Sequence, residues 1–545
     1  MARFHANKLI DLIFLLALSV VLTLPAFLPR VLALSWDGVL HMGRFTQIAL
    51  AFQHGTLPSM ISFIGEGKYL TAMIGMYPWM ADLILILPLA IINSKIIALV
   101  IGYVILNFIT GFNIYLLMGS LTKRRLLKFL GVVLYLFNGY HILDLYVRVE
   151  WGEVVAYAFF PLVILGLYDI WQKKKDGTLF LSMGMIGIAN SHFLSLLAVV
   201  IIITVIELYR FIRHRVFLNE IKSLIKSAII SILGSLYSLL QFFHIIIGTK
   251  LFTPIKAVNQ VSISASMSAL IHNRMSEAFQ TWHIGLVLVI IFLFLLIELI
   301  RSKGKFERYD YYTVAAFFSL LLVFEIFHDN LVQKKWIVNT IGNFQMTGRF
   351  LIFTVLMIII AFVIYCDLNH TNRKVIWLVM LITIGMSMFA THNYIKGTDI
   401  NRYPVSSKTW NNVIESIPEF FDYIPKQMAD KVYPTQQDVS SGVKVTKVAS
   451  NYNSATYLIK AKKNIVQLPI ACYSNIKYQI KINGKNAKYS SRDSELVVKL
   501  PKKESHLYIT NSLSIGWYPI FFLSLIVNII LAVMLIVYYF RLETE

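Results

Sequence analysis

Long apolar runs recur along the whole chain, and short polar segments separate them. A helix needs about 20 mostly apolar residues to cross a bilayer, so a chain built from such runs threads a membrane repeatedly. No small-residue cleavage site follows the first run, and we expect it to remain as a span rather than to be removed as a signal peptide. The pattern predicts twelve membrane-spanning helices, at residues 9–28, 96–118, 126–143, 153–171, 178–190, 191–212, 223–247, 282–301, 309–328, 349–367, 374–393 and 515–540.

One apolar stretch, from Trp79 to Ile92, is too short for a crossing and contains Pro88. We interpret it as a re-entrant or interfacial helix. If it crossed, the basic residues that begin at Lys123 would face outward, and the later loops would break the positive-inside pattern. Without it, both chain termini and the basic clusters lie on the cytoplasmic side. Those clusters are at residues 123–125, 173–175, 210–215, 301–305 and 373–374.

The hydrophobic period changes after residue 393, where apolar and polar residues begin to alternate. The alternation predicts β-strands at residues 443–448, 455–459, 477–482, 496–500 and 507–510. Asn483 and Gly484, between two of these segments, are typical of a hairpin turn. We therefore expect three parts: a transmembrane domain over 1–393 that includes the extracytoplasmic loop 29–95, a small β-sandwich-like extracytoplasmic domain over 394–514, and a final helix with a cytoplasmic tail over 515–545.

Composition supports the same fold class, a polytopic α-helical membrane protein. Of the 545 residues 57% are apolar and 14% are charged, which is more apolar surface than a soluble core could hide. The net charge of +21 would indicate nucleic acid in a soluble protein, but the basic residues fall mostly in short loops between spans. We expect no nucleic-acid partner. The two cysteines, Cys366 and Cys472, are expected on opposite sides of a bacterial plasma membrane and suggest neither a disulfide nor a cysteine metal site.

Three outward segments, 29–95, 248–281 and 394–514, are long enough to build a site. In the first, Asp37, His41 and Arg44 share one face if residues 37–52 are helical. A carboxylate, an imidazole and a guanidinium would then converge just outside the membrane. The alternative is an amphipathic interfacial helix whose polar residues are solvated.

Further candidates lie at the ends of predicted spans. Arg148, Glu150 and Glu153 give a short loop an unusual charge density, which indicates that their side chains face a cavity rather than lipid. Alternatively, they are polar residues that anchor the ends of spans beside Trp151. His192 is expected at the same level, where a lone histidine is more often structural than catalytic.

Arg349 follows Gln345 at the outer end of a predicted span. At this depth an arginine can bind a lipid phosphate bidentately, or it can extend to the interface as a snorkelling side chain. The sequence contains no Walker A motif, dinucleotide-binding glycine motif, HExxH or nucleophile elbow, so nucleotide chemistry is not supported.

With these features the chain resembles the GT-C superfamily of membrane glycosyltransferases, and within it the bacterial membrane proteins called 6-pyruvoyl-tetrahydropterin synthase-related and the neighbouring YfhO-type family. The resemblance covers most of the chain in layout, although the motifs are short, and the pterin name implies no pterin chemistry. It departs from the usual pattern at Trp79 and at residues 346–348. The matching residues are Trp36, Asp37, His41, Arg44, Gly55, Leu57, Pro58, Tyr77, Pro78, residues 148–153, Pro161 and residues 345–350.

The resemblance implies transfer of a sugar from a polyprenyl-phosphate donor to an extracytoplasmic glycan, lipid or protein acceptor of the cell envelope. Asp37 would be the catalytic acidic residue, either as general base or as a ligand of a divalent cation such as Mg²⁺ or Mn²⁺. Arg148 and Arg349 would stabilise the leaving phosphate. The remaining candidate residues would bind substrate.

Two other functions are compatible with the chain. One is a lipid or polysaccharide transporter or flippase, which should carry polar residues at mid-membrane depth, and the spans show few. The other is a non-catalytic envelope assembly protein, which would tolerate the loss of Asp37.

Overall fold

The computed structural model describes the chain except residues 1, 29–31, 66, 254–255, 327–328, 398–402, 417–421, 433–442 and 542–545. Parts of the expected domain 394–514, the end of the expected span 309–328 and the expected cytoplasmic tail therefore lie outside the described residues.

Helices dominate the chain up to residue 432, and one more lies near its C-terminus. They are α1 (Ala2–Phe27), α2 (Trp36–Gln53), α3 (Met73–Met76), α4 (Leu83–Ile91), α5 (Lys95–Leu121), α6 (Arg125–Leu136), α7 (Gly139–Ile142), α8 (Trp151–Trp171), α9 (Gly177–Ala189), α10 (Phe193–Ile212), α11 (Leu218–Ile246), α12 (Ile263–Ile271), α13 (Leu286–Arg301), α14 (Arg308–Val323), α15 (Asp329–Val332), α16 (Lys335–Thr340), α17 (Leu351–Leu368), α18 (Arg373–Lys396), α19 (Trp410–Glu415), α20 (Lys426–Val432) and α21 (Trp517–Arg541). A π-helix, η1 (Leu143–Arg148), follows α7, and short 3₁₀ turns include η3 (Ile341–Phe344) and η4 (Thr347–Phe350).

Within the described residues, eight helices are long and apolar enough to cross a membrane. The pair Arg125–Leu136 and Gly139–Arg148 makes a ninth candidate if it is one span bent by 44°. The other predicted spans form shorter helices: α9 has 13 residues, and α13 and α14 have 16 each. The structure thus supports a multi-pass helical protein, and the number of twelve crossings stays a prediction.

The predicted re-entrant segment contains α4, a helix of nine residues with Pro88 inside it. At about 1.5 Å per residue this helix is too short to cross a bilayer. It packs on α5 and α2 and lies beside the site described below. The predicted helix in the first loop is also present as α2, which begins after Ser35.

Strands gather near the C-terminus. They are β5 (Val443–Asn451), β6 (Ser454–Ala461), β7 (Ile465–Ala471), β8 (Gln479–Ile482), β9 (Lys485–Ala487), β10 (Tyr489–Arg492), β11 (Glu495–Lys499) and β12 (Glu504–Thr510). Two antiparallel sheets, ordered β5-β6-β12-β8-β9 and β10-β11-β7, share one buried apolar core. All five predicted strand segments fall within strands or at their ends, whereas β7, β9 and β10 were not predicted. Both Asn483 and Gly484 have positive φ, as a two-residue hairpin turn requires.

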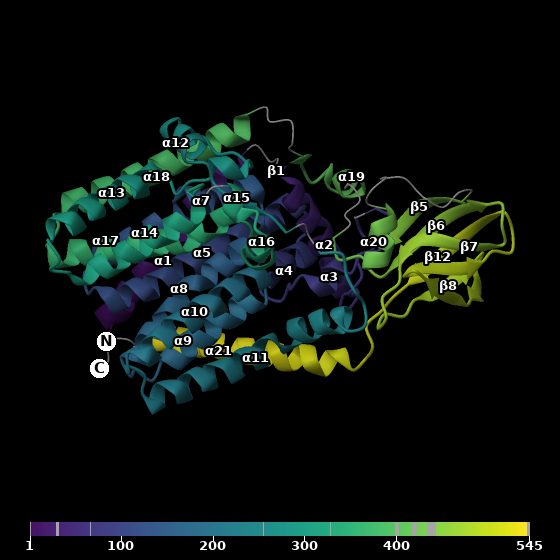
Figure 1. Cartoon of the computed structure of the whole chain (residues 1–545), viewed down its shortest axis with the longest axis horizontal. Helices are drawn as coiled ribbons and strands as arrows, with labels where there is room; N and C mark the ends of the chain where they lie inside the picture. The colour runs from purple at the N-terminus through teal and green to yellow at the C-terminus, as the bar shows by residue number, and fades with distance from the viewer. Residues whose placement is uncertain are drawn as a thin grey trace.

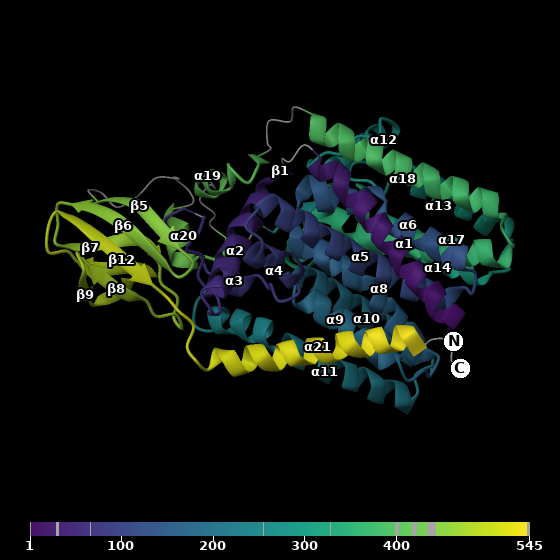
Figure 2. The ribbon, with the colours of Figure 1, turned by 180° about the vertical axis from the view of Figure 1, so that it is seen from behind.

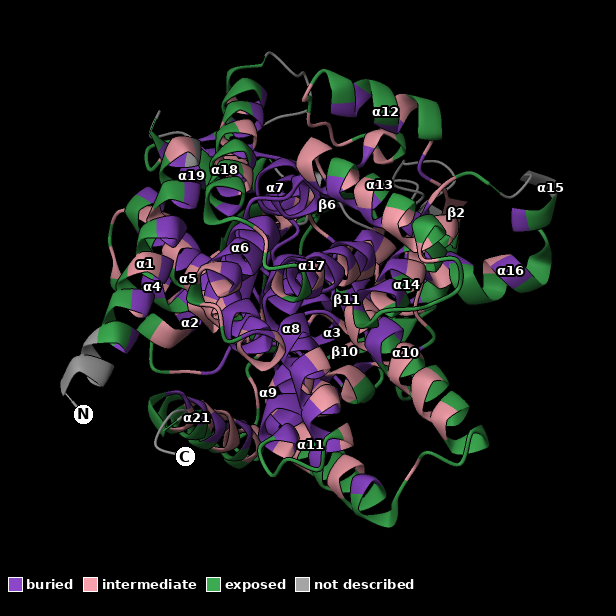
Figure 3. Ribbon diagram, turned by 90° about the vertical axis from the view of Figure 1, so that its left-hand side faces the viewer, coloured by how far each residue is buried: buried purple, intermediate pink, exposed green. Residues whose placement is uncertain are grey.

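The helices form one elongated body, and the two sheets, hereafter the β-domain, project from one end of it (Figure 1). Both chain termini lie at the opposite end (Figures 1 and 2). Seen along the long axis, α8 and α17 lie buried at the centre, whereas α10 and α11 lie at the periphery with exposed faces (Figure 3).

The loop after α2 joins the two parts. Phe63, Tyr69 and Leu70 belong to the same buried core as the β-domain. The backbone N–H of Ala471 donates to the carbonyl of Tyr69, and the Lys447 amine donates to three carbonyls of this loop. Two short strands, β1 (Leu32–Leu34) and β4 (Tyr403–Val405), pair and tie the start of α2 to the chain after α18. The β-domain is therefore docked on the segment that carries Asp37.

Candidate functional site

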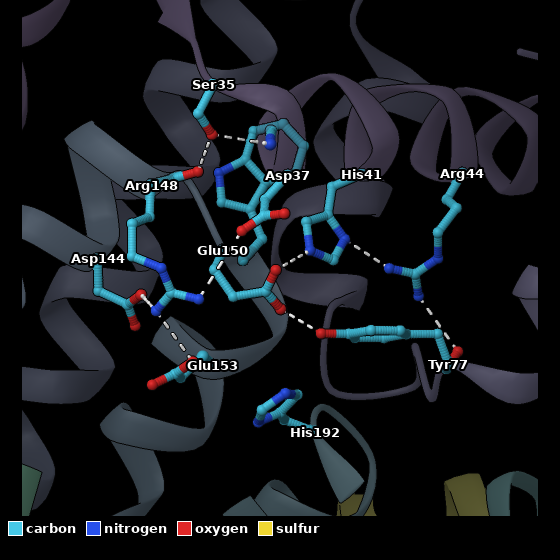
Figure 4. Close-up of polar contacts among 12 residues, drawn as sticks. Ser35, Asp37, His41, Arg44, Tyr77, Asp144, Arg148, Glu150, Glu153 and His192 are labelled. Carbon is cyan, nitrogen blue, oxygen red and sulfur yellow. Dashed lines mark hydrogen bonds and ion pairs between the residues drawn. The ribbon is translucent and has the colours of Figure 1, made fainter. Parts of the chain in front are cut away.

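A charged cluster lies where the body meets the β-domain, between α2, the junction of η1 with α8, and the start of α10 (Figure 4). Ser35 fixes the start of α2, because its hydroxyl accepts from the N–H of Gly38 and donates to the carbonyl of Arg148. Gly38 allows this close approach, since a Cβ there would lie 2.9 Å from the Cβ of Val149. The first turn of α2 thus rests directly on the chain that carries Arg148 and Glu150.

Val149 holds an unusual backbone conformation, with φ 55° and ψ 41°. A β-branched residue in the left-handed region is strained, and such strain clusters at functional sites. The preceding six residues form a π-helix, another feature that is frequent at functional sites. Together they turn the chain so that Arg148 and Glu150 point to different neighbours (Figure 4).

Glu150 is the centre of one buried network. Its carboxylate accepts from the Nε2 of His41 at 2.7 Å and from the hydroxyl of Tyr77. The guanidinium of Arg44 donates to the Nδ1 of His41 and to the carbonyl of Tyr77. Because arginine can only donate, Nδ1 must be an acceptor, and the proton of the ring lies on Nε2, where it faces Glu150.

The electrostatics of this network favour an ionised Glu150. Burial opposes ionisation, but His41, followed by His192 and Arg148, outweighs it and holds the pKa of the Glu150 carboxyl well below its ordinary value. Burial, and then the negative charge of Glu150, raises the pKa of the Tyr77 hydroxyl far above its ordinary value. Tyr77 therefore stays protonated and donates.

Arg148 is the centre of a second network. Its Nη1 donates to Asp144 at 2.8 Å and to Glu153 at 3.1 Å, and its Nη2 lies 3.8 Å from Asp37. The guanidinium also lies 4.7 Å from the ring centre of Trp282. One buried cation is thus shared by three carboxylates, so most of its charge is already compensated.

Asp37 differs from the other acids because 49% of its side-chain surface remains exposed. The protein surrounding the carboxyl still raises its pKa above the ordinary value, Glu150 adds to the rise, and Arg148, His41 and Arg349 oppose it. Asp37 is therefore an accessible carboxylate with a raised pKa, as a general base requires.

Arg349 enters from η4, before α17. Its Nε lies 3.2 Å from Glu153, and its Nη1 donates to the carbonyl of Phe344 at 3.1 Å. Arg349, Glu153 and His192 line one end of a narrow fissure, with a cavity of about 30 Å³, between α8, α9, α10 and α17. The rest of the lining is mostly apolar and includes Val199 and Phe353.

The remaining candidates lie in different places. His192 caps α10, with its Nδ1 2.7 Å from the Ser195 hydroxyl, and burial lowers its pKa to about 4 despite the opposing influence of Glu153. Gln345 stands apart, because its backbone pairs with Val258 and, within the described part of the chain, its side chain makes no hydrogen bond to the cluster. Its φ of 60° is strained.

The structure brings in acids that the sequence pattern did not select. Asp82 is fully buried before α4, and neither of its carboxylate oxygens has a hydrogen-bond partner among the described residues. Burial raises the pKa of Asp82 well above its ordinary value, and Arg44 only partly opposes the rise. Asp422 lies on the segment before α20, and burial followed by the charge of Asp37 raises its pKa to about 6. No sequence motif pointed to Asp422, whereas Tyr77 was among the residues on which the resemblance to the GT-C superfamily rests.

The described carboxylates do not form a preassembled metal site. In the part of the chain that the structure describes, no group of three His, Cys, Asp or Glu side chains is placed to hold a metal ion, and the carboxylates that meet at Arg148 surround a guanidinium. Glu150 already accepts from His41 and Tyr77, and Glu153 already pairs with Arg148. Proteins often bind Mg²⁺ through only one or two carboxylates, with substrate phosphate and water as the other ligands, so the role of Asp37 as a cation ligand stays a prediction.

Comparison with protein-family models, with curated proteins and with solved structures finds no match for this chain.

Proposed function

We propose that this protein is a membrane glycosyltransferase of the GT-C type, which transfers a sugar from a polyprenyl-phosphate donor to an acceptor of the cell envelope. One observation carries the proposal: ion pairs connect the accessible carboxylate of Asp37 through Arg148 and Glu153 to the guanidinium of Arg349, which lines a fissure whose walls are mostly apolar. An anionic headgroup with a long hydrocarbon tail has the matching distribution of polarity. The cavity of about 30 Å³ is smaller than a ligand site, so the fissure must widen to admit such a lipid.

In this proposal Asp37 is the catalytic base. It accepts the proton of the acceptor hydroxyl as the oxygen of that hydroxyl bonds to the anomeric carbon of the donor sugar. The bond from that carbon to the phosphate oxygen breaks, and the phosphate keeps the electron pair. A raised pKa suits the task, because proton transfer is most efficient when the pKa of the base lies near the working pH.

Arg349, rather than Arg148, would receive the developing phosphate charge. Arg148 is already shared by Asp144, Glu153 and Asp37, so an added anion would compete with three carboxylates. Among the described residues Arg349 pairs with Glu153 alone, and it keeps donors beyond the one given to Phe344. The resemblance gives both arginines the same role at the leaving phosphate, whereas their contacts favour Arg349 for that role.

The same arrangement supports an extracytoplasmic site. The cluster and the β-domain lie at one end of the body, and both termini lie at the other. The basic clusters at residues 123–125, 173–175 and 373–374 adjoin helix ends on the side of the termini. The positive-inside rule would then place the termini in the cytoplasm and Asp37 outside, where a lipid-linked donor arrives by lateral diffusion.

Asp37→Asn tests the proposal. The purified protein in vesicles is given an envelope extract and a panel of polyprenyl-phosphate hexoses, and the release of free polyprenyl phosphate is measured, so that the acceptor need not be known. We expect the variant to lose activity by a factor of about 100 or more, because the amide cannot accept the proton. Asp176→Asn, at an exposed acid in the loop before α9, is the matched control and should keep full activity. A folded Asp37→Asn variant with wild-type turnover would contradict the proposal.

A further inference from the structure

A second hollow lies at the opposite end of the body from Asp37. It has a volume of about 350 Å³ and is formed by the loop between α8 and α9 and by the start of α11. Volumes of this size are typical of ligand sites. Its lining includes Lys173, Lys174, Lys175, Phe217 and Glu220.

The charge of this hollow is positive. Lys173 lies 4.6 Å from the ring centre of Phe217, and Lys175 has no hydrogen bond or ion pair within the described residues. Lys174 pairs with Asp169 at 2.8 Å. The one acid in the lining, Glu220, accepts from Arg210 and is almost completely buried. Two ammonium groups, of Lys173 and Lys175, therefore face the hollow without a compensating carboxylate.

An apolar furrow of about 520 Å³ lies beside the hollow, between α9, α10 and α11. Its lining includes Met185, Leu208, Leu224 and Ala228. Arg210 connects the two linings, because it pairs with Glu220 of the hollow at 3.1 Å and with Glu207 of the furrow at 3.6 Å. A cationic hollow thus adjoins an apolar furrow. Two of the helices that line the furrow, α10 and α11, lie at the periphery of the body (Figure 3).

We propose that this second site binds the headgroup of an anionic glycerophospholipid, with an acyl chain in the furrow, in the membrane leaflet far from the β-domain. Charge complementarity selects an anion, and the furrow selects one that carries a hydrocarbon chain. A soluble anion would use the lysines and leave the furrow empty. A zwitterionic lipid would use the furrow and gain little from the lysines. The site does not depend on sugar transfer, because none of its residues touches the cluster around Asp37.

Lys173→Gln/Lys175→Gln tests the headgroup contacts. Lys174 is kept, because its loss would leave the buried Asp169 unpaired. Retention of added phosphatidylglycerol by the intact detergent-solubilised protein is measured by native mass spectrometry. At about 1 kcal/mol per lysine near a membrane surface, the double variant should bind phosphatidylglycerol about 30-fold more weakly. Lys462→Gln/Lys463→Gln, at two exposed lysines of the β-domain, is the control of equal charge and should bind as the wild type does.

Ala228→Trp tests the furrow, because the larger side chain fills it without changing charge. We expect this variant to lose phosphatidylglycerol as well. Phosphatidylcholine and inorganic phosphate are titrated in parallel, and we expect neither to compete with phosphatidylglycerol. Equal retention of phosphatidylcholine, displacement by inorganic phosphate, or unchanged phosphatidylglycerol binding in the lysine variant would each overturn the proposal.

Discussion

The helical body carries a buried polar cluster at each end, and the two are built differently. At the end of the termini, Asp11 accepts from the hydroxyl of Tyr115 and pairs with Arg125, whose side chain is 46% exposed. Among the described contacts of Asp11, one acid thus meets one cation and one hydroxyl. At the other end, three carboxylates share Arg148, and Asp82 is buried with no hydrogen bond among the described residues.

The backbone differs between the two clusters as well. Val149, at positive φ, lies directly beside the cluster around Arg148. No residue of α1 or α5 that contributes to the Asp11 cluster has a positive φ. Buried charge in excess and backbone strain both cost free energy, and a fold retains them where the arrangement serves chemistry. We therefore interpret the Asp11 cluster as a stabilising contact and the Arg148 cluster as the site of the proposed function.

Glu150→Ala should have the largest effect. The truncation leaves the Nε2 proton of His41 and the partly buried hydroxyl of Tyr77 without an acceptor, which costs about 2–6 kcal/mol of unfolding free energy at about 1–3 kcal/mol for each lost partner. Sugar transfer should fall as well, because the network positions the first turns of α2. Unfolding is measured by titration of SDS into mixed micelles. Glu150→Gln, which keeps an acceptor oxygen, should recover most of the stability. Equal losses of stability in both variants would contradict the explanation by lost hydrogen bonds.

Asp422→Asn should change the pH dependence of activity more than its maximum. The charge of Asp37 adds to the rise in the pKa of Asp422. This repulsion is reciprocal, so removing an ionised Asp422 lowers the pKa of Asp37. In the proposed mechanism Asp37 is an ionised base, and activity is lost as the pH falls through its pKa. The acid limb of kcat/KM should therefore move to lower pH in the variant. A limb that stays in place, or moves to higher pH, would separate Asp422 from the site.

Local patterns predicted much of this fold. The turn at Asn483 and Gly484, the alternating strands and the helix after Ser35 each depend on neighbours in sequence, and all are present. The helix around Pro88 was also predicted to be too short for a crossing, because the length of the apolar segment alone decides this. The number of membrane crossings was harder to predict. A 13-residue helix such as α9, or a bent pair such as α6 with α7 and η1, can be as apolar as a straight full-length span.

Most of the candidate residues that the structure brings together could be selected from the sequence, but their connections could not. Spacing along α2 placed Asp37, His41 and Arg44 together, and local charge density selected Arg148, Glu150 and Glu153. The pairing of His41 with Glu150 joins residues 109 apart, which no local pattern encodes. The conformation of Val149 is set by tertiary contacts against the preference of its side chain. Asp422 could not be found for the same reason, because only the docking of the β-domain brings its segment to Asp37.

Asp11→Asn should have the smallest effect, and it examines whether the two ends are independent. The variant loses a partly exposed ion pair but keeps an acceptor for Tyr115, so the cost should be about 0.5–1 kcal/mol. Turnover per folded molecule should not change. Helix α5 offers a route of coupling, because it carries Tyr115 beside Asp11 and also Tyr103, whose hydroxyl accepts from the indole of Trp151 at 2.6 Å. If turnover drops together with stability, α5 transmits the disturbance, and the cluster at the far end is part of the working site rather than a stabilising contact.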